Sequence, residues 1–206
     1  MHRFAFILAL GLATAARAQS DVALVDLVSG PVSYGGGKVT PYMKVREGDR
    51  FTLARGAQVR LLYFQGSRQE HFAGPASFTA GKQSSTLQSG SQPRVTTVPS
   101  VVPRRISRIP ELVDNARLGG VQLRGRPPEK PEDDALREAR TLYERMRREM
   151  PPDDITPELF LYATLVDYNR FAEMRPIAEE MVRRQPGSEE AKTLAAWVRS
   201  RSGGVK

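Results

Sequence analysis

The chain has 206 residues, a formal net charge of +8 and no cysteine. The lack of cysteine excludes disulfides, thiol catalysis and cysteine-ligated zinc, so the fold must depend on burial alone. Residues 19–126 carry 15 Lys and Arg against 7 Asp and Glu, whereas residues 127–206 carry 14 against 16. The basic excess therefore lies in the first part of the chain, and the shift in charge favours two structural parts.

The N-terminus has the pattern of a secretory signal peptide over residues 1–18. A basic start precedes an apolar run over residues 4–16, and Ala16-Arg17-Ala18 places small residues one and three positions before a cleavage site that follows Ala18. The run is too short to span a bilayer, which needs roughly 20 apolar residues, and no second run of that length follows. An uncleaved anchor is the alternative. We therefore expect a periplasmic protein whose mature chain has no transmembrane segment.

Residues 19–98 are expected to form an all-β domain, either a small sandwich or a roll. Gly and Pro recur between short runs rich in Val, Leu, Phe and Thr, which is typical of strands joined by tight turns. Both alternating faces of residues 59–64 carry apolar groups, so this strand is predicted to be central and covered on both sides. Gly66 then permits a turn into a second strand over residues 69–73.

The order of these turn motifs resembles the extracytoplasmic domain of FecR-type proteins. The resemblance covers residues 22–98 and implies a non-enzymatic binding domain in the cell envelope. The best-known members also have a membrane-spanning helix and a cytoplasmic segment that contacts a sigma factor. We expect neither in this chain, which argues against a direct anti-sigma role. The segments that carry the resemblance are Val28–Val32, Val45–Asp49, Gly56-Ala57, Gly66-Ser67 and Gly74–Ala76.

Residues 99–131 are predicted to be a Pro/Arg-rich linker. Its six prolines remove backbone donors and favour extended geometry in the residues before them, although a short helix is expected over residues 111–118. Arg104, Arg105 and Arg108 are the candidate anion-binding residues, because clustered guanidinium groups can hold phosphate or carboxylate by bidentate contacts. A solvated tether is the alternative interpretation.

Residues 132–201 are predicted to be helical, with a disordered tail over residues 202–206. Apolar residues recur at three- and four-residue steps over residues 135–150, which is typical of an amphipathic helix, and similar patterns follow. The expected boundaries are Pro151-Pro152 after the first helix, Thr156-Pro157 and Asn169-Arg170 around the second, Pro186-Gly187 after the third, and Ser188 as the cap of the last.

Two of these helices share a spacing that is similar to the second helix of a tetratricopeptide repeat, whose period is about 34 residues. The resemblance implies one and a half repeats plus a terminal helix. Because repeat arrays need about three units unless neighbours cover their ends, we expect the helices to dock on the β domain or to self-associate. The fold class is therefore α+β and multidomain, with N-terminal strands and C-terminal helical hairpins. The matching positions are Ala139, Tyr143 and Met146 before Pro151, and Met174, Ala178 and Met181 before Pro186.

The sequence has few groups that could perform chemistry. His71 is the only histidine after the signal peptide, and its neighbour Glu70 is predicted on the opposite face of the strand. Acidic clusters at residues 132–134 and 153–154 stand at helix starts, where negative charge complements the helix dipole. We therefore assign no catalytic, cofactor-binding or metal-binding residue, and we predict that the protein is not an enzyme and has no cofactor.

Three functions stay open from the sequence. The leading prediction is an exported adaptor of the cell envelope that binds another envelope protein or an anionic wall polymer. The second is a periplasmic, FecR-like regulatory component that relays a signal to a membrane partner. The third is a cell-wall hydrolase, which would require carboxylates in a cleft and which the sequence disfavours. Nucleic acid is not an expected partner of an exported protein, and a solubilising surface explains the basic excess equally well.

Overall fold

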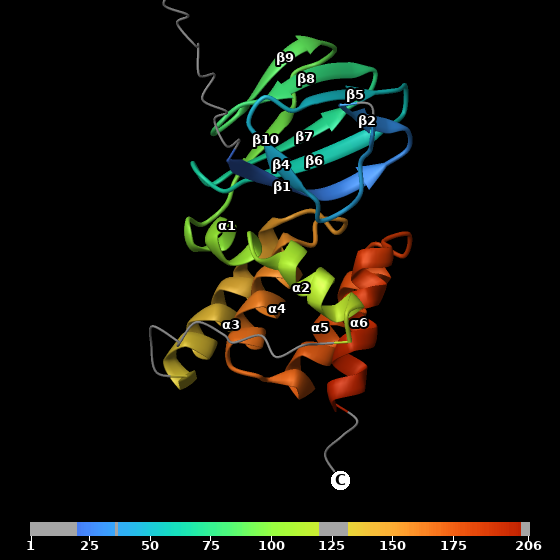
Figure 1. The fold of residues 1–206 in the computed structure, drawn as a ribbon. Coiled ribbons are helices and arrows are strands. Elements are labelled where there is room, and N and C mark those ends of the chain that lie inside the picture. Colours follow the sequence, from blue (N-terminus) through green and yellow to red (C-terminus); the bar gives the residue numbers. More distant parts are fainter. Residues whose placement is uncertain (1–19, 36, 120–131, 203–206) are drawn as a thin grey trace, which may run out of the picture.

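The computed structural model describes residues 20–35, 37–119 and 132–202, and it places a β-sandwich on a layer of helices (Figure 1). The predicted signal peptide, the second half of the predicted linker and residues 203–206 lie outside the described residues. The strands of the described part are β1 (Asp21–Ser29), β2 (Val32–Tyr34), β3 (Gly37–Lys38), β4 (Lys44–Arg46), β5 (Arg50–Leu53), β6 (Gln58–Tyr63), β7 (Arg68–Ala73), β8 (Ala76–Ala80), β9 (Ser85–Ser89) and β10 (Arg94–Thr97).

Two antiparallel sheets form the sandwich. Among the described strands, the first sheet has the order β10-β7-β6-β1-β4 and the second has the order β3-β2-β5-β8-β9. Their facing sides meet in an apolar core, where Phe72 of the first sheet stacks on Phe78 of the second with ring centroids 3.8 Å apart. The predicted all-β arrangement of the N-terminal part is therefore confirmed at the level of two antiparallel sheets.

Strand β6 lies at the centre of the first sheet and is buried on both faces, as predicted. Val59, Leu61 and Tyr63 point into the sandwich core, whereas Leu62 belongs to a second core that the helices form. The turn predicted at Gly66 is also present, and its φ of +85° is a conformation that glycine adopts without strain. The face of the first sheet that is turned away from the second sheet is thus available to the helices.

The first half of the predicted linker is folded, which corrects that prediction. It forms two helices, α1 (Val101–Ile106) and α2 (Ile109–Arg117), whose apolar side chains are buried in the second core. Pro103 and Pro110 lie in the first turns of these helices, where a backbone N–H has no helical partner to lose. The prolines therefore open helices here, and the helix expected over residues 111–118 begins two residues earlier.

The remaining helices follow most of the predicted boundaries. The Ser188 hydroxyl accepts a hydrogen bond from the Ala191 N–H at 3.1 Å, so the predicted cap is confirmed. Asn169, with a φ of +55°, lies in the expected break between the helix that ends at Asp167 and the helix that begins at Phe171. Ser202, the first residue of the predicted tail, is still helical. The bounds are α3 (Glu132–Glu149), α4 (Thr156–Asp167), α5 (Phe171–Arg184) and α6 (Glu189–Ser202).

Helix α4 differs from the amphipathic helix that was expected. Its residues from Thr156 to Val166 are all buried, because α1, α3 and α5 pack around it. A helix that is covered on all sides needs no polar face. After the break at Asn169-Arg170, Phe171 begins α5 and packs edge-on against Trp197 of α6.

The helices dock on the sandwich, which confirms one of the two expected ways of covering them. Leu24 of β1 and Leu62 of β6 share a continuous apolar core with Ile106, Leu159 and other helical residues. Figure 1 shows the helical layer against the sheet that contains β1, β4, β6, β7 and β10. The two parts are thus joined by a common core as well as by the chain.

Candidate functional site

The structure brings two of the three candidate anion-binding arginines onto one carboxylate. Arg105 of α1 and Arg108 of the α1–α2 turn both form ion pairs with Asp167 at the end of α4. Asp167 is nearly buried, so the cluster holds α1 on α4 and is not a tether. Arg104 lies on the same helix and lines a groove beside this pair.

That groove runs between α1, α3 and α4 and has a volume of about 180 Å³. Val101 at the start of α1 is 42% exposed beside it, although most large apolar residues of the described part are buried. Arg104 and Arg105 border the groove on one side and Glu138 borders it on the other. Its lining thus combines an apolar floor with charged margins. The apolar lining residues are Val101, Ala135, Ala139, Leu142, Phe160 and Tyr168.

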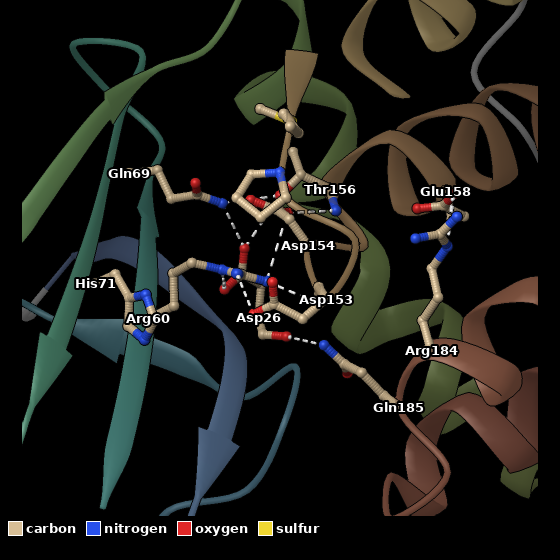
Figure 2. A network of polar contacts seen from close by, with 12 residues as sticks. Asp26, Arg60, Gln69, His71, Asp153, Asp154, Thr156, Glu158, Arg184 and Gln185 are labelled. Atoms are coloured by element: carbon tan, nitrogen blue, oxygen red, sulfur yellow. Dashed lines mark hydrogen bonds and ion pairs between the residues drawn. The ribbon is translucent and has the colours of Figure 1, made fainter. Parts of the chain in front are cut away.

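A second polar cluster lies where the sandwich meets the helices (Figure 2). Asp26 of β1 is fully buried there, and its carboxylate accepts hydrogen bonds from Arg60 Nε at 2.8 Å, Gln69 Nε2 at 2.8 Å and Thr156 Oγ1 at 3.1 Å. Arg60 and Gln69 belong to the first sheet, whereas Thr156 begins α4. Three donors from both parts therefore converge on one buried carboxylate.

Arg60 also contacts the acidic pair that precedes α4. Its Nη2 lies 3.4 Å from Asp154 Oδ1, and its Nη1 lies 3.6 Å from Asp153 Oδ2, which is an ion-pair distance without a hydrogen bond. Asp154 in turn accepts the Thr156 N–H at 2.9 Å. The prediction that this pair serves the start of a helix is confirmed for Asp154, and its ion pair with Arg60 is an additional role.

The charges of this cluster do not balance. Asp26, Asp154 and Arg60 are each at most 1% exposed, so two buried carboxylates share one buried guanidinium group. Burial raises the pKa of Asp26 to about 6, and the Asp154 charge acts in the same direction, while Arg60 opposes both. The contacts of the cluster are internal, so we interpret it as the joint between the two parts and not as a ligand site.

The joint extends along the loop between α5 and α6 and into the helices. Gln185 donates from Nε2 to the backbone oxygen of Asp26 at 3.0 Å. Deeper in the helices, Glu158 is fully buried and pairs with Arg147 at 2.8 Å and Arg184 at 3.4 Å. Burial raises the pKa of Glu158 above its ordinary value, although the nearby Arg147 opposes this shift. Figure 2 shows Glu158 and Arg184 to the right of the Asp26 cluster.

His71 and Glu70 lie on opposite faces of β7, as predicted. The Glu70 carboxylate accepts the Ser85 N–H of the second sheet at 3.0 Å, whereas His71 contacts Gln58 and Arg94 within the first sheet, each at 3.1 Å. Because Arg94 donates to Nδ1, Nε2 carries the ring proton and donates to Gln58. Partial burial and the nearby Arg60 lower the pKa of His71, which favours this neutral ring.

Sequence reasoning did not identify Asp26, Arg60 and Gln69 as a group. One signal was present, because Asp26 and Arg60 each interrupt an otherwise apolar strand, and an unpaired charge is costly there. Their partners come from residues 34 to 159 positions away in the chain, and no spacing rule joins them.

Among the described residues, no group of three or more His, Asp or Glu side chains is placed to hold a metal ion. Within the same ranges, no helix has both the length and the apolar character that crossing a membrane requires. No protein-family model, curated protein or solved structure matches this chain.

Proposed function

We propose that the chain is an exported adaptor of the cell envelope that binds another protein at the groove between α1, α3 and α4 and catalyses no reaction. The observation that carries the proposal is the groove itself. Its apolar lining includes Val101, which is exposed, and Leu142 and Tyr168, which are partly buried. Accessible apolar side chains with charged margins are typical of protein-binding surfaces.

The size and charge of the groove define the partner. At about 180 Å³ it is smaller than pockets for small-molecule ligands, which start near about 300 Å³, so it fits one or two side chains of a larger partner. Asp167 balances only one of the charges of Arg105 and Arg108, so the α1 margin is net basic. A partner segment with an apolar side chain next to a carboxylate complements both properties.

The two family resemblances fit this function. FecR-type domains and tetratricopeptide repeats both act by binding, and repeat helices of this kind present recognition surfaces. An anionic wall polymer is less well supported as the partner, because Arg105 and Arg108 already share an internal carboxylate.

Two matched variants test the proposal in the full chain. Val101→Glu places a charge in the groove, and Val95→Glu places the same charge on β10, where Val95 is 44% exposed and does not line the groove. After in-cell crosslinking, a protein that copurifies with the wild type and with Val95→Glu should be lost with Val101→Glu. Circular dichroism checks that both variants fold.

Purified partner should then bind the wild-type chain directly, with weaker binding by Val101→Glu. Recovery of the same proteins by all three chains would exclude the groove as the recognition site. Recovery of polysaccharide alone would exclude a protein partner.

A further inference from the structure

One edge of the first sheet lacks a strand over part of its length. Strand β1 has nine residues, but β4 pairs only with Asp21, Ala23 and Leu24. The loop before β4 adds two backbone hydrogen bonds at Val25, of 2.7 and 3.0 Å, and then diverges. On the opposite side, β1 stays paired with β6 as far as Ser29. Among the described residues, no strand covers residues 27–29 on the β4 side.

A groove of about 470 Å³ follows this uncovered edge. Residues 27–30 form its floor. Residues 38–41, at and after the end of β3, form one wall, and residues 184–190, at the junction of α5 and α6, form the other. Gln185 marks its inner end, because its side chain donates to the Asp26 backbone oxygen at 3.0 Å. The volume lies within the range of about 300–1,000 Å³ that is usual for binding sites.

The residues on this edge lack the usual protection of an edge strand. Natural edge strands are commonly blunted by charge, proline or a covering element, since free backbone groups pair readily with another chain. Leu27 and Val28 are uncharged and only partly buried, and Leu27 belongs to neither apolar core. The register shift between Val25 and Leu27 marks where the edge leaves its cover.

We propose that this groove binds an extended peptide segment of another protein, which adds a strand to the edge of β1 at residues 27–29. Main-chain hydrogen bonds would hold the segment, as in other cases of strand addition. Leu27 takes an apolar side chain of the segment. Lys38 on the wall forms no ion pair with another described residue, so its ammonium group takes an acidic side chain of the segment. The site is separate from the groove between α1, α3 and α4 and does not depend on it.

The test uses a random heptapeptide library displayed on phage and the chain from Gln19 to Lys206. Enriched peptides should slow amide hydrogen exchange at residues 27–29. Gly187→Trp should weaken their binding by about tenfold, which corresponds to about 1.4 kcal/mol. A Cβ at Gly187 meets no atom within 4 Å, so the larger side chain fills the groove without displacing backbone.

Two further variants make the result specific. Gln88→Trp, on the exposed β9 of the other sheet, should bind the peptides as the wild type does. Lys38→Glu should no longer bind the peptides that carry an acidic side chain. This result tests the proposal even if Gly187→Trp fails to fold. The proposal is wrong if no peptide is enriched, if exchange at residues 27–29 is unchanged, or if Gly187→Trp binds equally well. Exchange protection that rises with protein concentration alone would assign the groove to a second copy of the chain instead.

Discussion

Asp26 shows how a single residue can join two parts of a protein at an electrostatic cost. Its carboxylate accepts three hydrogen bonds, yet Asp154 is also buried and Arg60 is the only cation that contacts both among the described residues. A buried carboxylate that lacks its full share of positive charge is stabilised by binding a proton. The joint between the sandwich and the helices should therefore respond to pH.

We predict that Asp26 stabilises the fold as the pH falls. Its pKa is about 6 in the folded chain, above the ordinary value of 3.8, so its contribution is complete below pH 3.8 and is lost as pH rises through about 6. Between pH 7 and pH 5 this group should add about 1 kcal/mol to the free energy of unfolding. Urea unfolding of the wild type and of Asp26→Asn at both pH values measures the difference.

The variant is the control because it cannot titrate at this position. Glu173 and Glu180, whose pKa values are lowered by nearby arginines, lose stabilisation on acidification in both proteins and cancel from the comparison. An equal change with pH in both proteins would show that Asp26 does not take up the proton.

Helix α1 is the element whose role differs most from the expectation. Ile106 is completely buried in the core that the helices share with the sheet, whereas Val101 on the same helix is 42% exposed. We predict that Ile106→Ala lowers the free energy of unfolding by about 2–5 kcal/mol and that Val101→Ala changes it by less than about 0.5 kcal/mol. Urea unfolding measures both values. If both substitutions changed the free energy of unfolding by less than about 0.5 kcal/mol, α1 would not contribute to the core and the linker interpretation would hold.

The same element shows how far sequence patterns extend. The central position of β6 could be predicted because apolar side chains lie on both alternating faces of this strand, which indicates burial on both sides. Helix α1 and the first two residues of α2 were missed because proline was taken to break helices, although it also occupies the first turns of both helices. The all-round burial of α4 could not be predicted, since it depends on neighbours from distant segments.

The candidate sites show the same limit. The three arginines were identified from their clustering, but Asp167, the carboxylate that Arg105 and Arg108 share, lies about 60 residues further along the chain. The groove on β1 arises because β4 is shorter than β1, and strand lengths were not predicted. The sequence therefore identified the arginine cluster, whereas the fold determined which of its members are paired internally and which line a groove.

At the scale of the whole molecule, we predict that the sandwich and the helices unfold together. The second core includes Leu24 and Leu62 of the sheet, and the Asp26 cluster spans the same boundary, so separation would expose apolar surface and buried charge at once. The single tryptophan, Trp197, reports on α6 by fluorescence, while circular dichroism at strand wavelengths reports on the sandwich. The two signals should follow one urea transition with one midpoint.

Separate midpoints would mean that the shared core is too weak to couple the parts, and a chain ending at residue 131 would then fold alone. If the transition is single, that shortened chain should fail to fold, because Leu24, Leu62 and helices α1 and α2 would lose the packing that α3 to α6 provide in the shared core. The proposed partner binding must then be tested with point variants of the 206-residue chain.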